Sequence, residues 1–181
     1  ADPKAGDGAG ILVQMPDEFL RAVVDFDLPP AGEYGVGMVF LPRDEGPRAD
    51  MQAIVNRHIE SGGQTVLGWR DVPVDNSDLG ETVRPSEPIV RQVFIGCGPR
   101  CHDQESFERK LFVMRKRMDN GIRASGYEKT AYYVSSMSSR TVNYKGMLLA
   151  YQVGQYYRVL RDERFASALA LVHQRFSTNT F

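Results

Sequence analysis

The sequence predicts an α+β fold, because short apolar segments typical of strands are mixed with segments of helical spacing along the whole chain. No regular strand–helix–strand rhythm and no internal repeat is visible, which argues against a parallel α/β sheet. With 181 residues, of which 42% are hydrophobic, the chain is long enough for one domain with a substantial core but not for two.

Expected strands and helices alternate through the first half of the chain. The apolar residues 10–15 predict a buried strand. Pro16 can open the next helix because the first helical residue needs no amide hydrogen, and the stretch 28–30 closes it. The further elements expected are a strand at 35–41, a helix at 49–60 ended by Gly62 and Gly63, a strand at 64–70 and a surface loop at 71–88.

The second half contains the clearest helix, at 104–118. Asp103 is a favourable cap for it, and apolar residues recur at helical spacing from Phe107 to Met118. The periodicity of residues 166–174 fits a helix or a strand, and we predict a strand because the polar motif that follows needs an extended lead-in. The other elements expected are strands at 89–96, 130–137 and 140–145 and a helix at 147–158.

Charge and composition argue against several classes of function. The 22 basic and 23 acidic residues leave a net charge of −1, which does not favour a nucleic-acid or anionic-membrane partner. No apolar run approaches the roughly 20 residues that a membrane-spanning helix needs, and the N-terminal residues do not resemble a secretory signal. Only two cysteines, Cys97 and Cys101, are present, which suits a reducing compartment such as a bacterial cytoplasm or a plastid.

The glycine cluster Gly6-Asp7-Gly8-Ala9-Gly10 is the first candidate site. It is not a dinucleotide fingerprint, because the expected strand follows the glycines instead of preceding them, and it is not a phosphate loop, because no Gly-Lys-Ser/Thr follows. The spacing fits either a tight turn that enters a strand or a substrate-facing loop.

The cysteines and the basic residues are the next candidates. Cys97, Cys101 and His102 have no second ligand pair at metal spacing, and sequence neighbours such as Cys101 and His102 seldom face each other as a catalytic dyad. We therefore predict two free structural thiols and no metal site. The basic residues between 109 and 117 fit a solvated helix face better than a nucleic-acid interface, because few aromatic residues are interleaved with them.

The C-terminal segment has a more suggestive pattern. Arg175 follows the expected strand, and the small polar residues Ser177, Thr178 and Asn179 come directly after it. An arginine at a strand end is well placed to hold a carboxylate with two parallel hydrogen bonds. A capped surface turn would explain the same residues, and the chemistry alone leaves both interpretations open.

Motifs at both ends of the chain, and two between them, resemble one family. They are GDGAGILVQMP at 6–16, FERKLFVMRK at 107–116, SSRT and YKGML between 138 and 148, and HQRFSTNTF at 173–181. In order and spacing they resemble the class II glutamine amidotransferase domain of glutamate synthases, over essentially the whole chain.

The resemblance implies a four-layer αββα sandwich of the N-terminal-nucleophile hydrolase type. In this family a cysteine at the mature N-terminus attacks the side-chain amide of L-glutamine, and the released ammonia travels to a second site that converts 2-oxoglutarate to glutamate. That second site is implied to use FMN and an iron–sulfur cluster, with NADPH or ferredoxin as reductant. The implied partners are the remaining domains of the polypeptide and a small reductase subunit.

The resemblance also implies which parts of the site the chain contains. Because it starts at Ala1 and ends before the family's oxyanion-hole residues, we expect residues 1–181 to be a partial domain that is inactive alone and has no catalytic residue. The implied site residues are Arg175 on the α-carboxylate of glutamine, Thr178 and Asn179 in the same pocket, and Asp7, Gly8 and Gly10 in a loop near the catalytic site. The alternative is a non-catalytic binding or structural module in which Arg175 contacts another domain.

Overall fold

The computed structural model describes residues 2–128 and 131–175. Its helices and strands are β1 (Ala9–Gln14), α1 (Asp17–Val23), β2 (Tyr34–Leu41), α2 (Glu45–Ser61), β3 (Thr65–Asp71), β4 (Ile89–Gly96), α3 (Gln104–Ala124), β5 (Tyr133–Ser138), β6 (Thr141–Gly146), α4 (Val153–Tyr156) and β7 (Ala170–His173). Short 3-10 helices lie at Arg84–Ser86, Ala150–Gln152 and Arg158–Arg161.

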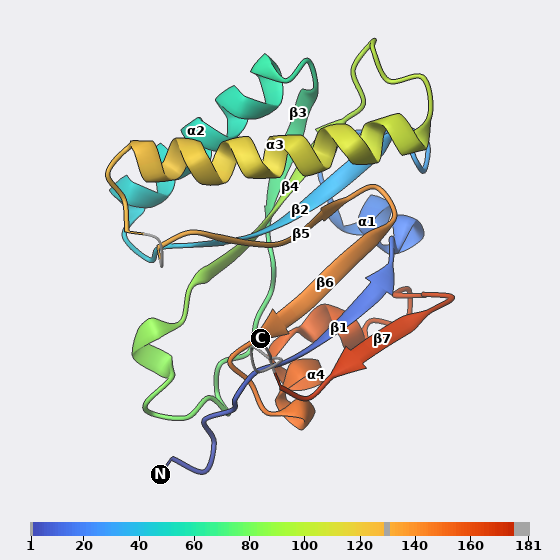
Figure 1. Cartoon of the computed structure of the whole chain (residues 1–181). Helices are drawn as coiled ribbons and strands as arrows, with labels where there is room; N and C mark the ends of the chain where they lie inside the picture. The colour runs from blue at the N-terminus through green and yellow to red at the C-terminus, as the bar shows by residue number, and fades with distance from the viewer. Residues whose placement is uncertain (1, 129–130, 176–181) are drawn as a thin grey trace, which may run out of the picture.

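Two antiparallel sheets form the framework of the fold (Figure 1). One sheet has four strands in the order β3-β4-β2-β5, and the other has three strands in the order β6-β1-β7. This mixture of helices and antiparallel sheets confirms the α+β class. Because β5 and β6 follow each other in the chain but belong to different sheets, the turn between them connects the two sheets.

Helices α2 and α3 cover one face of the four-stranded sheet (Figure 1). Met51 of α2 and Phe107 and Leu111 of α3 pack into one apolar cluster with Val93 and Ile95 of β4, and all five side chains are 0% exposed. Helix α3 begins at the cap that the sequence predicts, because the Asp103 carboxylate accepts a hydrogen bond from the amide of Ser106. This half of the molecule is therefore closely packed.

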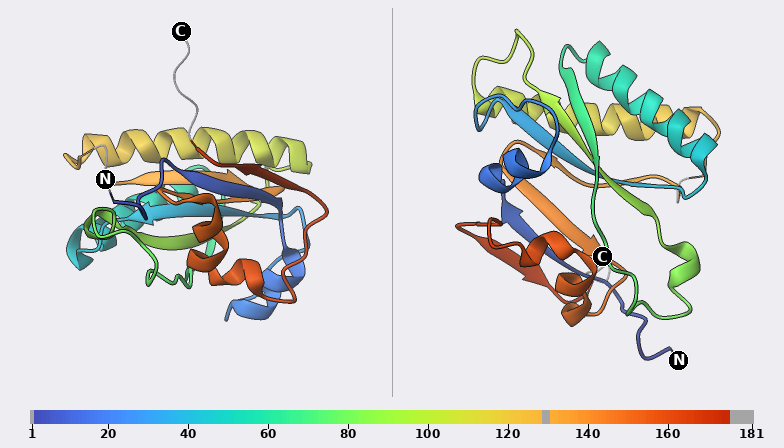
Figure 2. Two further views of the ribbon diagram at one scale, coloured as in Figure 1. Left: turned by 90° about the horizontal axis from the view of Figure 1, so that it is seen from below. Right: turned by 180° about the vertical axis from the view of Figure 1, so that it is seen from behind.

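A second apolar cluster joins the two sheets. Val36 and Met38, on the opposite face of β2, pack together with Val13 of β1, Tyr144 of β6 and Phe19 of α1. Helices α1 and α4 lie on the side of the strands opposite to α3 (Figure 2). Helices therefore lie on both sides of the two sheets, as they do in the predicted αββα sandwich.

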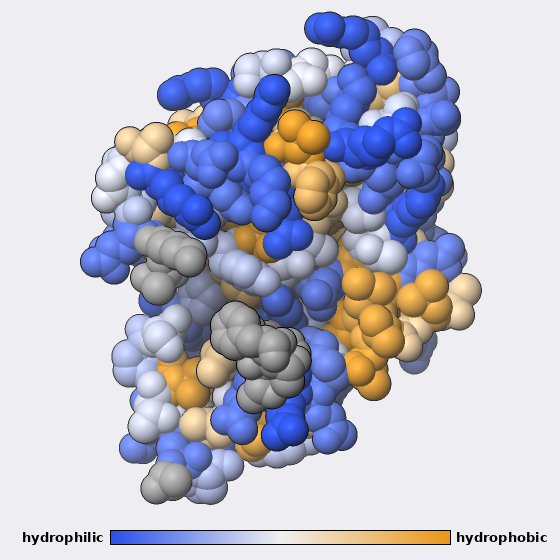
Figure 3. Space-filling view, in the orientation of Figure 1, coloured by the Kyte–Doolittle hydropathy of each residue, from blue (hydrophilic) through white to orange (hydrophobic). Residues whose placement is uncertain are grey.

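The outer face of the three-stranded sheet is open to solvent. Among the described residues, no helix packs on this face, and Leu171 of the edge strand β7, which stands opposite Leu12 on this face, is 67% exposed. Figure 3 shows the resulting apolar patch over β1 and β7. The two sheets therefore differ sharply in how much of their surface is covered.

The predicted helices differ from the structure in their bounds. The helix expected to begin at Pro16 and to be closed by residues 28–30 is the shorter α1, with Pro16 as its N-cap and its last residue at Val23. The helix expected at 49–60 begins earlier, at Glu45.

The helix expected at 104–118 continues to Ala124, because Ile122 extends its buried face. The single helix expected at 147–158 is wrong: the segment is broken into a 3-10 helix, the single turn of α4 and another 3-10 helix. Tyr156 and Tyr157 are both buried, and Tyr157 forms a β-bridge with Val74, which a continuous helix would not allow.

The segment 71–88 is only in part the surface loop that the sequence predicts. The Glu87 carboxylate is buried and accepts hydrogen bonds from Arg43, Asn76 and the Tyr156 hydroxyl, each at 3.0 Å. The strand predicted at 166–174 is confirmed as the shorter β7.

Candidate functional site

The candidate site lies at one end of the three-stranded sheet. Strand β1 pairs antiparallel with both neighbours, and Gly10 stands opposite Lys145 of β6 and opposite His173 of β7. Because β7 runs antiparallel to β1, its last residues lie beside the first residues of β1. The glycine cluster and Arg175, which are far apart in the sequence, therefore meet at the same sheet end.

The glycines of the cluster are required by the backbone and by close neighbours. Gly8 has φ of +112°, a conformation that other residues rarely adopt. A side chain at Gly6 would collide with the backbone of Leu148. At Gly10 a Cβ atom would stand 2.5 Å from the Lys145 Cβ and 2.7 Å from the His173 Nε2, so only glycine fits between these two side chains. The structure has a bend at Asp7 that leads into β1, in place of the predicted tight turn, and a substrate-facing role stays a prediction.

The charged residues of the predicted site are accessible. Asp7 and Arg175 are both exposed, and Arg175 follows β7 by two residues. The guanidinium of Arg175 forms no hydrogen bond or ion pair with the part of the chain that the structure describes, so it is available to an anionic group. Ser177, Thr178 and Asn179 lie outside the described residues, and their roles stay predictions.

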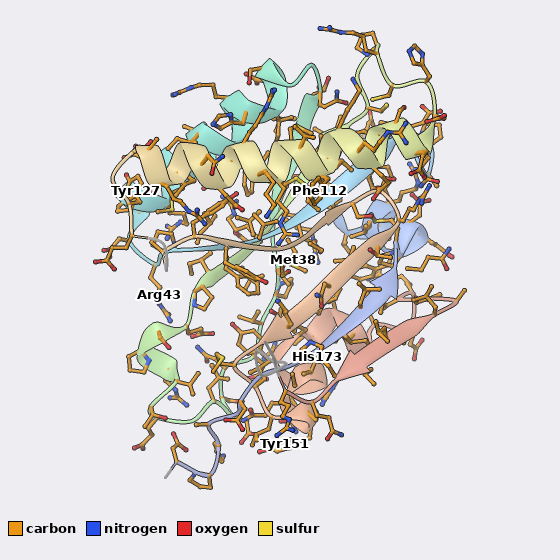
Figure 4. All side chains as sticks on the ribbon, viewed as in Figure 1. Met38, Arg43, Phe112, Tyr127, Tyr151 and His173 are labelled. Carbon is orange, nitrogen blue, oxygen red and sulfur yellow. The ribbon has the colours of Figure 1, made fainter. Side chains whose placement is uncertain are left out.

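The sequence did not indicate a role for two residues at this sheet end, Lys145 and His173. Both lie inside motifs that carry the resemblance, yet neither sequence pattern shows that they flank Gly10 on one face. Figure 4 labels His173 on the three-stranded sheet. The ammonium of Lys145 lies 4.7 Å from the centre of the Tyr133 ring, within range of a cation–π interaction. Only the strand register, which depends on long-range pairing, brings these side chains together.

An apolar cavity of about 390 Å³ lies beside this sheet end, between the ends of strands from both sheets. Its walls include Phe40, Leu148, Tyr156 and Tyr157. Burial raises the pKa of both tyrosine hydroxyls above the usual range, so these phenols stay protonated at neutral pH. No feature of the sequence predicted this cavity.

The two cysteines lie in the loop that follows β4 of the four-stranded sheet. Cys97 and Cys101 are free thiols, as the sequence predicts, and the Gln64 side-chain oxygen accepts from the amide of Gly98 at 2.8 Å and from Cys101 at 3.3 Å. Burial, reinforced by the neighbouring Cys101, raises the pKa of Cys97 to about 12. Among the described residues, no three His, Cys, Asp or Glu side chains gather in a way that could hold a metal ion.

Two antiparallel sheets, with an arginine brought beside a glycine-rich bend at the end of one of them, fit a class II amidotransferase. Residues 1–181 match the family described as glutamine amidotransferases class-II, and the chain belongs to that family. Within it, the chain is similar to glutamate synthases. It is 49% identical to the large chain of the NADPH glutamate synthase of Bacillus subtilis (strain 168), covering 100% of this chain and 12% of that protein.

More distant relatives include both bacterial and chloroplastic proteins. The large chain of the NADPH glutamate synthase of Azospirillum brasilense is 38% identical over 100% of this chain, and the chloroplastic ferredoxin-dependent glutamate synthase 2 of Arabidopsis thaliana is 33% identical over 99%. The chain spans only 12% and 11% of these two proteins. In the described part of the chain, no helix is both long enough and apolar enough to cross a membrane.

Proposed function

We propose that this chain is the part of a glutamate synthase glutaminase domain that binds the α-carboxylate of L-glutamine. The observation that carries the proposal is the strand register, which brings Arg175 to the sheet end where the bend at Asp7 leads through Gly8 into β1 and Gly10 pairs with His173. Similarity to glutamate synthases along the full chain supports the assignment.

Arg175 supplies the charge that the substrate requires. A guanidinium matches a carboxylate with two parallel hydrogen bonds, and such charge-assisted bonds contribute about 1.5–3 kcal/mol each. Thr178 and Asn179 would then offer hydroxyl and amide groups to the polar atoms of the same substrate. Asp7, Gly8 and Gly10 would shape the bend that faces it, with a mainly conformational role.

The reaction itself needs groups from the rest of the parent polypeptide. We propose that the cysteine nucleophile, with its α-amine as base, and the oxyanion donors belong to segments outside residues 1–181. The released ammonia would reach a domain in which FMN and an iron–sulfur cluster supply the reducing chemistry that forms glutamate from 2-oxoglutarate. The reductant would be NADPH or ferredoxin, and a small reductase subunit would be a further partner.

The substitution Arg175→Lys in the full-length enzyme tests the proposal. Lysine keeps the charge but loses the planar fork, so we expect glutamine-dependent kcat/KM to fall about tenfold or more, since about 1.4 kcal/mol corresponds to one decade. Ammonia-dependent glutamate formation should be largely spared, because ammonia has no carboxylate. The matched control is Arg123→Lys on the exposed end of α3, which should leave both activities unchanged.

The two activities also decide between the proposal and its alternative. If Arg175→Lys reduces the glutamine-dependent and ammonia-dependent activities equally, Arg175 holds the fold or a domain contact. The non-catalytic binding or structural module would then be the better description of this chain.

A further inference from the structure

We propose that His173 is a positioning residue for glutamine binding: its imidazole, seated over Gly10, holds the end of β7 and thereby fixes the direction in which Arg175 leaves the sheet. This inference rests on the proposed function of Arg175. The described residues support it through the register, the packing and the exposure of β7.

The pairing register of β1 and β7 fixes the position of His173, directly opposite Gly10. Lys145, Gly10 and His173 form one cross-strand row, and side chains at opposed positions of an antiparallel pair lie on the same face. The middle residue of the row has no side chain. The His173 Nε2 lies 2.7 Å from the place of a Cβ at Gly10, so the imidazole occupies the space that any other residue at position 10 would fill.

The packing of β7 shows why this position matters. The strand has four residues, and β1 is its one partner strand within the described residues. Its middle residues Leu171 and Val172 are each 67% exposed, whereas His173 is only partly exposed. Side chains in the middle of β7 therefore contribute little to holding it against the sheet.

The two ends of β7 are held by different contacts. Where the chain enters the strand, the Ser167 hydroxyl accepts a hydrogen bond from the Gln14 amide at 2.9 Å, and the Ala168 amide donates to the Gln14 side-chain oxygen at 3.3 Å. Where the chain leaves the strand, the last paired residue is His173 on Gly10. Arg175 is two residues further on, so the orientation of its backbone depends on this final contact.

The experiment uses the full-length enzyme and compares His173→Ala with Leu171→Ala, an exposed residue on the same strand and the same face. We expect His173→Ala to raise KM for glutamine about tenfold with kcat largely kept, because misplacing a binding group by about an ångström can cost up to about 100-fold. Ammonia-dependent activity should not change, and Leu171→Ala should behave as wild type.

Two further variants separate positioning from other roles. His173→Phe keeps a ring over Gly10 and should recover most of the affinity for glutamine. In an Arg175→Lys background, His173→Ala should add little, because residues that act through one contact are not additive. A fall in kcat in both His173→Ala and His173→Phe, or full additivity with Arg175→Lys, would overturn the inference.

The outcome for Arg175 distinguishes this inference from the proposed function. If Arg175→Lys itself leaves KM for glutamine unchanged, the proposed function has failed. If Arg175→Lys raises KM but His173→Ala does not, the proposed function stands and His173 has no positioning role. Equal loss of both activities in His173→Ala would show that the imidazole only maintains the fold, and would also overturn the inference.

Discussion

The two sheets use their residues in different ways. The four-stranded sheet has α2 and α3 on one face and the second apolar cluster on the other, so its central strands are buried on both sides. The three-stranded sheet has one covered face, and its outer face carries Gly10 and His173 of the candidate site together with the exposed Leu171 of β7. Closely packed apolar side chains are therefore concentrated in the four-stranded sheet, whereas the side chains of the candidate site lie on the three-stranded sheet.

Glycines show the same contrast at the level of single contacts. In β2, a Cβ at Gly35 would stand 2.7 Å from Leu111, and one at Gly37 would stand 2.7 Å from Val93. Because these glycines have no side chain, the apolar core side chains can pack directly against the β2 backbone. In β1, Gly10 instead admits the polar side chains of Lys145 and His173. The same residue type serves close packing in one sheet and the arrangement of polar groups in the other.

The largest effect on stability is expected where α3 packs on the four-stranded sheet. Phe107→Ala should lower the free energy of unfolding by about 3–5 kcal/mol, because it leaves a cavity in a core that cannot fully collapse. Phe107 is 0% exposed, whereas Phe112 of the same helix is 61% exposed, so Phe112→Ala is the matched control and should cost less than about 0.5 kcal/mol. Urea unfolding of both variants, followed by circular dichroism, measures the difference. Equal costs would mean that the closely packed half does not dominate stability.

An intermediate effect is expected at Glu87, where contacts from both halves meet. Its buried carboxylate joins Arg43, which follows β2, to Tyr156 of α4. Glu87→Gln removes the charge and leaves at least one of the three donors without a good acceptor, which should cost about 1.5–3 kcal/mol. Glu81→Gln, an exposed position in the same segment, is the control and should have little effect. Unchanged unfolding in Glu87→Gln would mean that the buried carboxylate contributes little to holding the two halves together.

The sequence predicted the closely packed half better than the half with the site. The strand at 89–96 has the predicted bounds, and the stripe from Phe107 to Met118 identified α3, because burial on a broad face leaves a strong periodic signal. The segment 147–158 has no such periodicity. Its backbone bends so that Tyr156 and Tyr157 fill space between elements, and this long-range packing overrides local preference.

The site shows a similar division. Arg175 and the glycine cluster stand out by residue type alone, since a strand-end arginine and closely spaced glycines each have a specific chemical or conformational use. The role of Gly10 as the seat of His173 depends on the pairing of β1 with β7, which are about 160 positions apart in the chain. A distinctive single residue can be recognised from a sequence, whereas the alignment of residues across three strands cannot, because it depends on long-range pairing.

The smallest expected effect concerns the thiol at the end of β4, and it tests whether burial controls chemistry in the closely packed half. Burial raises the pKa of Cys97 from 9.0 to about 12, so nearly all of the thiol is protonated at pH 8. In the wild-type protein, iodoacetamide should therefore alkylate Cys97 far more slowly at pH 8 than after unfolding in urea, and the rate should rise only toward pH 12. Tryptic cleavage after Arg100 places Cys97 and Cys101 in separate peptides. The neutral thiol is favoured in the folded state, so its contribution to stability is present below pH 9 and is lost as the pH rises from 9 toward 12. Mass spectrometry of the alkylated peptide measures the rate. Equally fast labelling of folded and unfolded protein at pH 8 would show that Cys97 is as accessible and as readily ionised as in the unfolded chain, so that burial does not control its chemistry.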